Sequence, residues 1–347
     1  MARRVWIHVG LPKTGTTYLQ GLLWGNRAEV QKAGLLLPGT QTMHAHASAY
    51  VRERHLQRGN ARAVERGWRR FVDQVNHASG DVLLTHELLA PVPAERAEHA
   101  IAALGGDETH IVITARDLAR QIRSGWQQRV KQGETLPLAE FTDEVVHRGP
   151  GAGSFWQMQD PVDVAARWGV TLGADRVHVV TLPPSGSDPT LLWRRFAGLV
   201  DIDPDCLVPA GSGANESIGR VGVELLRRIN EQRGDRFPVR GNHRWIRGLL
   251  ANEILAARDD KEQFALDPSV HDWVLNEART MVAELRKQGY DIVGDLADLV
   301  PAGEPEGAAD PSSSSDGELL NVAIGTVLDL LDIHRRTVNE APHRTRR

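Results

Sequence analysis

Four short apolar segments in the first two hundred residues alternate with segments of helical periodicity. The apolar segments are rich in β-branched residues, and they cover residues 5–9, 82–85, 110–114 and 176–181. Each is too short for a typical helix, so we expect four buried strands. Helical patterns follow them at residues 17–23, 94–104, 118–131 and 190–199. Continuous apolar strands that alternate with helices indicate a parallel sheet covered on both faces, which is an α/β fold.

The second half of the chain is expected to be mostly helical, because no strand pattern follows residue 240. We expect one domain over residues 1–300, then a flexible linker over 301–317, where Pro, Gly, Ala and Ser predominate. An amphipathic helix is expected over 318–337, and a basic tail over 338–347.

The expected C-terminal helix has one apolar face, formed by Leu320, Ala323, Ile324, Val327, Leu328 and Leu331. Residues at this spacing share one side of a helix. Such a face either docks on the chain's own domain or is buried against a partner subunit. The second arrangement would produce a homodimer, and the sequence leaves both arrangements open.

The composition narrows the classes of partner. The 347 residues carry a formal net charge of -4, which argues against general nucleic-acid binding. The single cysteine, Cys206, excludes an intrachain disulfide, so we expect a reducing, cytoplasmic location. No apolar run has the length of a membrane span, and the histidines do not have the spacing of metal ligands. We therefore expect neither a membrane span nor a bound metal.

The segment after the first expected strand is the main candidate for chemistry. It reads Gly10-Leu11-Pro12-Lys13-Thr14-Gly15-Thr16-Thr17 and leads directly into a helix. Backbone N–H groups converge in such a loop, and the helix dipole favours an anion. The two glycines have the spacing of a Walker A loop, in which a lysine follows the second glycine. Here Thr16 occupies the place of that lysine, and Lys13 lies inside the loop.

The run from Pro12 to Thr17, between an apolar strand and a helix, resembles the 5′-phosphosulfate loop of sulfotransferases. The resemblance implies a three-layer fold related to the P-loop nucleoside triphosphatases, with a central parallel sheet and additional helices. It implies 3′-phosphoadenosine 5′-phosphosulfate (PAPS) as the sulfate donor and no required metal, since a sulfuryl group carries less charge than a γ-phosphoryl group. In this family the loop lysine stabilises charge on the leaving phosphate. The resemblance therefore assigns that role to Lys13 and assigns donor contacts to Pro12, Lys13, Thr14, Gly15, Thr16 and Thr17.

A donor with a 3′-phosphate needs a second anion site. The resemblance implies an arginine at the end of the third expected strand and a serine eight residues later, on the following helix. Arg116 and Ser124 have these positions and this spacing. Arginine suits the task because its planar guanidinium group binds phosphate through two hydrogen bonds.

Transfer to a hydroxyl group also needs a base that removes the proton of the acceptor. In sulfotransferases the base follows the strand before the one that ends in the 3′-phosphate arginine, and here that position reads Thr85-His86-Glu87. Some family members use a histidine and others a glutamate. The resemblance alone does not decide between the two residues. We favour Glu87 as the base and keep His86 as the alternative.

The sequence thus predicts a sulfotransferase that moves a sulfuryl group from PAPS to a hydroxyl group or an amine. The acceptor is a small molecule, a sugar or a glycolipid, and the sequence does not distinguish these classes. Two alternatives stay open: a P-loop kinase that uses ATP and Mg²⁺, and a nucleotide-binding relative without catalytic activity.

Overall fold

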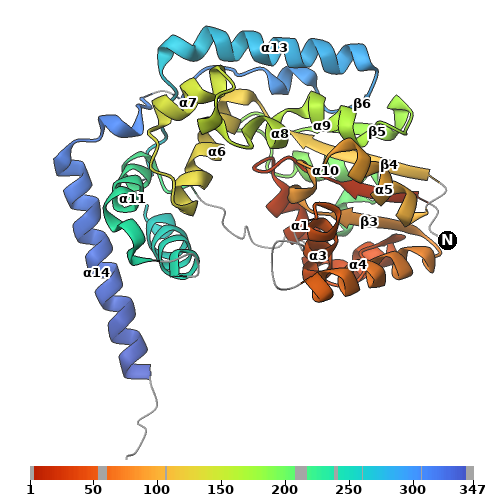
Figure 1. Cartoon of the computed structure of the whole chain (residues 1–347), viewed down its shortest axis with the longest axis horizontal. Helices are drawn as coiled ribbons and strands as arrows, with labels where there is room; N and C mark the ends of the chain where they lie inside the picture. The colour runs from red at the N-terminus through yellow and green to blue at the C-terminus, as the bar shows by residue number, and fades with distance from the viewer. Residues whose placement is uncertain are drawn as a thin grey trace, which may run out of the picture. The chain divides into compact units, whose positions relative to one another are not determined.

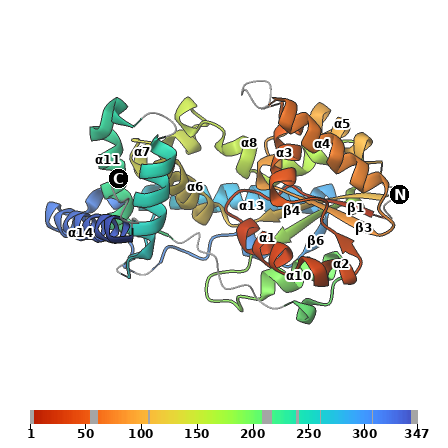
Figure 2. The ribbon, with the colours of Figure 1, turned by 90° about the horizontal axis from the view of Figure 1, so that it is seen from below.

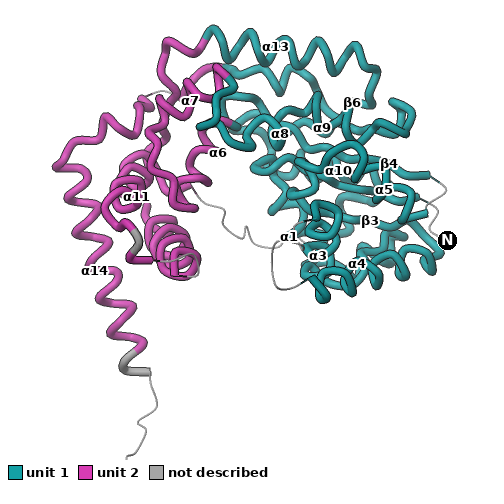
Figure 3. The backbone as a smooth tube through the Cα atoms, viewed as in Figure 1, with its two compact units in different colours: residues 1–121, 148–213, 272–302 teal, residues 122–147, 214–271, 303–347 magenta. Residues whose placement is uncertain are grey.

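The structure is a computed structural model that describes residues 4–53, 61–105, 108–207, 217–237, 241–259, 261–305 and 307–340 (Figure 1). The chain divides into two compact units (Figure 3). Unit 1 comprises residues 1–121, 148–213 and 272–302, and unit 2 comprises residues 122–147, 214–271 and 303–347. Both units are therefore discontinuous in sequence, whereas the sequence predicts one continuous domain over residues 1–300.

Unit 1 contains a single six-stranded sheet, and every strand pair in it is parallel. Its strands are β1 (Arg4–His8), β2 (Leu35–Leu36), β3 (Asp81–Thr85), β4 (Glu108–Ala115), β5 (Val177–Thr181) and β6 (Asp291–Val293). The expected parallel α/β sheet is confirmed, and its four central strands coincide with the four apolar segments. The edge strands β2 and β6 were not expected, because two or three residues give no periodic signal.

Helices cover both faces of this sheet and produce three layers (Figure 2). One face packs against α1 (Thr16–Gly25), α2 (Arg27–Lys32) and α10 (Leu191–Leu199). The other packs against α3 (Gln41–Val51), α4 (Ala61–Asn76), α5 (Ala94–Leu104), α9 (Pro161–Trp168) and α13 (His271–Gln288). Alternation along β1 explains the two cores, because Val5 and Ile7 point to the second face and Trp6 to the first. A short helix, α8 (Phe155–Gln159), precedes α9.

The strand order β2-β3-β1-β4-β5-β6 places the start of the chain in the middle of the sheet. The chain runs from β1 outward to β2, returns to β3 beside β1, and then passes β1 to form β4 on its other side. In open parallel sheets, ligands bind at the carboxyl ends of the strands where such a change of direction occurs. We therefore expect a ligand to bind at the loops that follow β1, β3 and β4.

The described part of unit 2 is helical. The helix α6 (Leu118–Gln132) begins in unit 1 and continues in unit 2, which also contains α7 (Leu138–Val146) and α11 (Arg220–Arg233). A π-helix, η7 (Asn242–Ile254), and the long α14 (Asp316–Glu340) follow. Among the described residues, no helix is long and apolar enough to cross a membrane.

The segment expected to be a flexible linker, residues 301–317, makes specific contacts within unit 2. Pro311 and Ser314 are buried, and the N–H group of Ala265 donates a hydrogen bond to the carbonyl of Ala309 at 3.2 Å. The helix α14 then begins at Asp316, two residues before the expected start. A proline and a serine are thus buried in this segment, which has few large apolar residues.

Among the described residues, none covers the expected apolar face of α14. The side chains that are buried are Leu319, Val322 and Thr326, whereas Leu320 and Leu331 are each 59% exposed. The helix thus packs within unit 2 through its less apolar side. Docking of the larger apolar face, one of the two arrangements open at the sequence level, is therefore wrong.

We expect replacement of Phe71 by alanine to lower the free energy of unfolding by about 3–5 kcal/mol. Phe71 lies on α4 with no exposed surface, and its ring contacts those of Trp68 and His44. Denaturation by urea measures the loss. As a control, Val170→Ala removes methyl groups from a side chain that is 55% exposed, so the change should stay within about 0.5 kcal/mol. A loss below about 1 kcal/mol for Phe71→Ala would contradict the described packing of this face.

Candidate functional site

The loop from Gly10 to Thr17 is shaped by three residues with left-handed backbone conformations. Gly10 has a φ of 70°, Lys13 a φ of 70° and Gly15 a φ of 81°. A lysine rarely adopts this conformation, which costs about 1–2 kcal/mol for a residue with a Cβ atom. Changes of backbone handedness turn successive N–H groups toward one side, as in the nests that bind anions.

The side chain of Thr14 connects this loop to β4. Its buried hydroxyl donates a hydrogen bond to the carbonyl of Leu11 at 2.5 Å. Because this bond uses the only proton of the Thr14 hydroxyl, the second bond runs the other way. The hydroxyl of Thr114 donates to Thr14 Oγ1, with 2.6 Å between the two oxygens. The N–H group of Leu11 also donates to the carbonyl of Thr114 at 3.1 Å. The loop is therefore fixed to the end of β4 by side-chain and backbone bonds together.

His8, the last residue of β1, extends these bonds across the sheet. Burial lowers the pKa of His8 to about 3, so its imidazole is neutral and has one donor and one acceptor nitrogen. The proton of Thr114 is donated to Thr14, so His8 Nε2 must donate to Thr114 Oγ1, at 3.3 Å. His8 Nδ1 then accepts from Thr85 Oγ1 at 2.9 Å. Gln20 Nε2 on α1 donates in turn to Thr85 Oγ1 at 3.4 Å.

Gly10 allows the loop to approach the residues that follow β3. A Cβ atom at this position would lie 2.9 Å from Thr16 Cγ2 and 3.1 Å from both Cα and Cβ of Glu87. Any side chain at position 10 would therefore displace one of these neighbours. The contact also shows that Glu87 lies directly against the first turn of the loop.

The helix α1 begins at Thr16, at the end of this loop. Gly15 is the N-cap residue, no side chain caps the helix, and no acidic residue lies in its first turn. Thr16 is buried and Thr17 is exposed at this end. The helix dipole and the N–H groups of the first turn favour a phosphate or sulfate group here.

Arg116 lies on the other side of the loop, directly after β4. Its Nη1 donates a hydrogen bond to the carbonyl of Lys13 at 3.2 Å. Gln121 supports the same segment, since its Nε2 donates to the carbonyl of Pro12 at 3.1 Å. Both contacts bind loop carbonyls and so help to fix the conformation of the loop.

Ser124, the expected partner of Arg116, lies on α6 in the part of that helix that belongs to unit 2. Arg116 belongs to unit 1. Their shared contact with a 3′-phosphate therefore stays a prediction from the sequence.

The two base candidates differ in their hydrogen bonds. His86 Nδ1 accepts from the N–H group of Leu88 at 3.2 Å, and this bond begins a short 3₁₀ helix, η2 (Glu87–Leu89). Burial lowers the pKa of His86, with a further lowering from Arg52 and an opposing effect of Glu87. Neutral His86 with an occupied Nδ1 carries its proton on Nε2, so neither ring nitrogen has a free lone pair.

The carboxylate of Glu87 does have acceptor capacity. Its side chain is 34% exposed, and its Oε2 accepts from Gln20 Nε2 at 3.3 Å. Gln20 therefore contacts both Glu87 and Thr85, and it connects the carboxylate to the buried bonds beneath the loop.

The sequence predicts roles for Lys13, Glu87 and Arg116 but gives none to four polar side chains that form hydrogen bonds beneath and beside the loop. These are His8, Gln20, Thr114 and Gln121. A signal for two of them was present, because His8 and Thr114 are polar residues at the ends of otherwise apolar strands. The role of Gln20 and Gln121 had no signal, since a polar residue on a helix is usually exposed.

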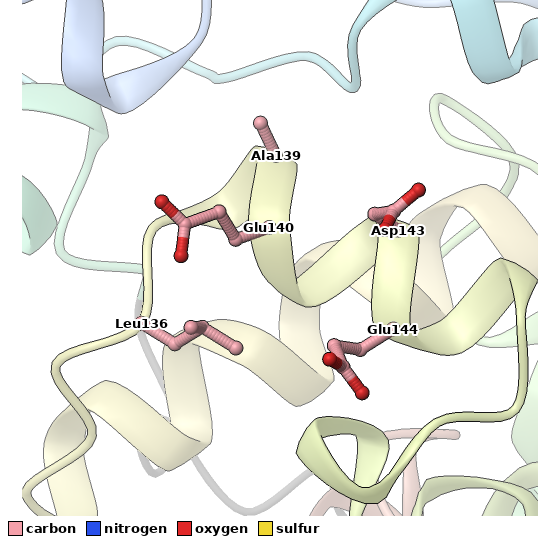
Figure 4. Close-up of a pocket in the computed structure, with 5 residues that line it drawn as sticks. All are labelled: Leu136, Ala139, Glu140, Asp143 and Glu144. Carbon is pink, nitrogen blue, oxygen red and sulfur yellow. The ribbon is translucent and has the colours of Figure 1, made fainter.

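A hollow on the surface lies elsewhere, at α7. It has a volume of about 480 Å³ and is lined by Leu136, Ala139, Glu140, Asp143 and Glu144 (Figure 4). Three carboxylates would repel an anionic nucleotide. The hollow therefore does not suit the expected donor. Among the described residues, no group of His, Cys, Asp or Glu has the arrangement of a metal site, and the expected independence from metal stays a prediction.

Comparisons with known proteins add no family to this description. No protein-family model, no curated protein and no solved structure matches the chain. The proposed function therefore rests on the residues and their geometry alone.

We expect the stability of the protein to depend on His44 in a pH-dependent way. His44 is buried, accepts a hydrogen bond from the N–H group of Thr85 at 3.1 Å and bonds the carbonyl of Pro38 at 3.0 Å. Burial lowers its pKa to about 4. The unfolded chain, with an imidazole pKa of about 6.5, binds a proton more readily than the folded one. The stabilisation that His44 provides is thus complete above about pH 6.5 and is lost as the pH falls toward 4.

The matched measurement is urea denaturation of the wild type and of His44→Gln, which has no titrating ring. The wild type should be the more stable at pH 7. Its advantage should shrink by about 3 kcal/mol at pH 4. An advantage that does not change with pH would show that His44 is not buried in its neutral form.

Proposed function

We propose that this chain is a sulfotransferase that uses PAPS and modifies a hydroxyl group or an amine on a small-molecule, sugar or glycolipid acceptor. One observation carries the proposal. The loop with Lys13 inside it lies between Glu87 on one side and Arg116 on the other, at the carboxyl ends of adjacent strands. In this proposal Lys13 is the cation for the leaving group, Glu87 is the base and Arg116 is a second anion-binding side chain. The proposal includes a fold related to the P-loop nucleoside triphosphatases and a cytoplasmic location.

The residues of the loop would hold the 5′ end of the donor. Backbone N–H groups of residues 13–17 and the N-terminus of α1 would bind the 5′-phosphosulfate, with the hydroxyls of Thr16 and Thr17. When bound, the donor supplies an activated sulfuryl group. Lys13 would stabilise the electron pair that the bridging oxygen retains when its bond to sulfur breaks. Arg116, with Ser124, would hold the 3′-phosphate and so orient the adenosine.

Glu87 would accept the proton of the acceptor as the new bond to sulfur forms. The products would be the sulfated acceptor and adenosine 3′,5′-bisphosphate, and Glu87 would be left protonated. Glu87 suits this role because its carboxylate is partly exposed beside the loop. His86 suits it less, since its Nδ1 is occupied by the N–H group of Leu88. The hydrogen bond from Gln20 would keep the carboxylate oriented.

The kinase alternative is less consistent with the loop. A Walker loop needs a lysine after its second glycine, and here Thr16 has that position and is buried. The alternative of a relative without catalytic activity is disfavoured because Lys13 and Glu87 are both present beside the loop.

Titration calorimetry with two nucleotides tests the proposal. Adenosine 3′,5′-bisphosphate should bind without Mg²⁺ at least about tenfold more tightly than ATP with Mg²⁺. Tight ATP binding without measurable binding of the bisphosphate would overturn the assignment in favour of a kinase.

We expect Arg116→Ala to weaken binding of adenosine 3′,5′-bisphosphate by about 10- to 100-fold, because a charged hydrogen-bonded pair is lost. Adenosine 5′-phosphate has no 3′-phosphate, so its affinity should change only about threefold or less, through the contact of Arg116 with the Lys13 carbonyl. Arg120→Ala is the matched control, because Arg120 instead bonds Asp117 and the carbonyl of Pro183. Equal losses for both nucleotides in Arg116→Ala would mean that this arginine only supports the loop.

Replacement of the two base candidates should separate them. Glu87→Gln should lower the transfer of labelled sulfate to acceptors in an extract of the source organism by about 10²- to 10⁴-fold. His86→Gln should lower it by less than about tenfold. Affinity for the bisphosphate, measured by calorimetry, should remain unchanged in Glu87→Gln. A larger loss in His86→Gln than in Glu87→Gln would exchange the two roles.

A further inference from the structure

The helix α14 carries an apolar face that nothing in the described chain covers. Its exposed large side chains are Leu320 (59%), Ile324 (51%), Val327 (54%), Leu328 (61%), Leu330 (37%) and Leu331 (59%). The opposite side of the helix is already used, because Leu319, Val322 and Thr326 are buried within unit 2 against α11 and η7. The exposed face is therefore a second surface of a helix that is already anchored.

The size of this face sets it apart from ordinary surface leucines. Six side chains, each bare over about half of its surface, present on the order of 400 Å² of apolar area. Contiguous apolar patches of this size on a protein surface usually mark an interaction site.

The spacing of the central residues matches that of a helix pair. Leu320, Ile324, Val327 and Leu331 follow one another at intervals of four, three and four residues. This is the repeat of a two-helix seam, in which each apolar side chain packs between residues of a facing helix. We propose that α14 pairs with α14 of a second copy of this chain, in antiparallel orientation.

Self-pairing follows from the symmetry of the face about one point. The intervals read the same in both directions, with their centre between Gly325 and Thr326. In an antiparallel pair related by a two-fold axis at this point, Leu320 faces Leu331 of the second copy and Ile324 faces Val327. Every apolar residue of the seam then has an apolar partner, as a closed two-fold interface requires.

Charge selects the antiparallel orientation over the parallel one. The same register places Asp316, whose side chain is 98% exposed, opposite Arg335 of the second copy, whose side chain is 68% exposed. A parallel pair would instead set Asp316 against Asp316 and Arg335 against Arg335. Each residue has an exposed charged neighbour in its own chain, Arg228 and Asp332 respectively. Such exposed pairs are weak and allow a second partner.

A membrane surface is a poorer occupant for this face. Helices that lie on anionic lipid have lysine or arginine on their polar side. The sequence of α14 carries five acidic residues and only two arginines, and it has no lysine. The helix α14 therefore lacks most of the basic side chains that hold such a helix on anionic lipid.

Sedimentation of the full-length protein between 1 and 100 µM tests the proposal, with a concentration-dependent monomer–dimer equilibrium as the expected result. The dimer should be weak, with a dissociation constant in the micromolar range, because the paired apolar area lies near the lower limit of specific interfaces. Leu328→Glu should shift the protein to monomer throughout this range. Thermal unfolding should be unchanged, since the side chain is exposed in the protomer. A wild type that stays monomeric at 100 µM would overturn the proposal.

Charge reversal tests the orientation independently of Leu328. At low salt, Asp316→Arg and Arg335→Asp should each weaken the dimer by about five- to tenfold, because each places like charges opposite one another twice per dimer. The double variant should regain the affinity of the wild type. Single variants without effect, or a double variant weaker than either, would overturn the antiparallel register. Binding of the wild type to vesicles of anionic phospholipid, lost in Leu328→Glu, would assign the face to a membrane instead. Neither test depends on the proposed enzymatic activity.

Discussion

The candidate site depends on one directional row of hydrogen bonds beneath the loop from Gly10 to Thr17. Its donors and acceptors follow one another through Gln20, Thr85, His8, Thr114, Thr14 and the carbonyl of Leu11. Each hydroxyl has one proton, so the direction of every bond is set by the next. The row is complete only if His8 is neutral, which its burial ensures. It joins the ends of β3, β1 and β4, and thereby sets the spacing between the loop and the residues on its two sides.

This arrangement fixes a short loop to the strands and helices around it. The side chains of Arg116 and Gln121 donate hydrogen bonds to loop carbonyls. Within the loop, the Thr14 hydroxyl donates to the carbonyl of Leu11. Gly10 allows Glu87 to lie against the first turn of the loop. A pre-formed site loses little conformational freedom when it binds an anion. Every residue that is expected to contact the sulfate donor belongs to unit 1, except Ser124.

The sequence predicts the central strands and the loop well, because strand hydrophobicity and glycine spacing are local signals. The edge strands β2 and β6 were missed because their few residues pair with a sheet that only the whole fold creates. The row of bonds through His8 and Gln20 was missed for a similar reason, since its partners are far apart in sequence. For α14, periodicity located the larger apolar face but not the side of the helix that is buried. Leu319 and Val322 are fewer than the exposed residues, yet they contact the rest of unit 2.

The most direct test of the account is a crystal structure of the protein with adenosine 3′,5′-bisphosphate. The account predicts the 5′-phosphate within hydrogen-bond distance of the N–H groups of residues 13–17 and the ammonium group of Lys13, and the 3′-phosphate on the guanidinium group of Arg116. The nucleotide bound elsewhere, or bound in the loop with its 3′-phosphate away from Arg116, would contradict it.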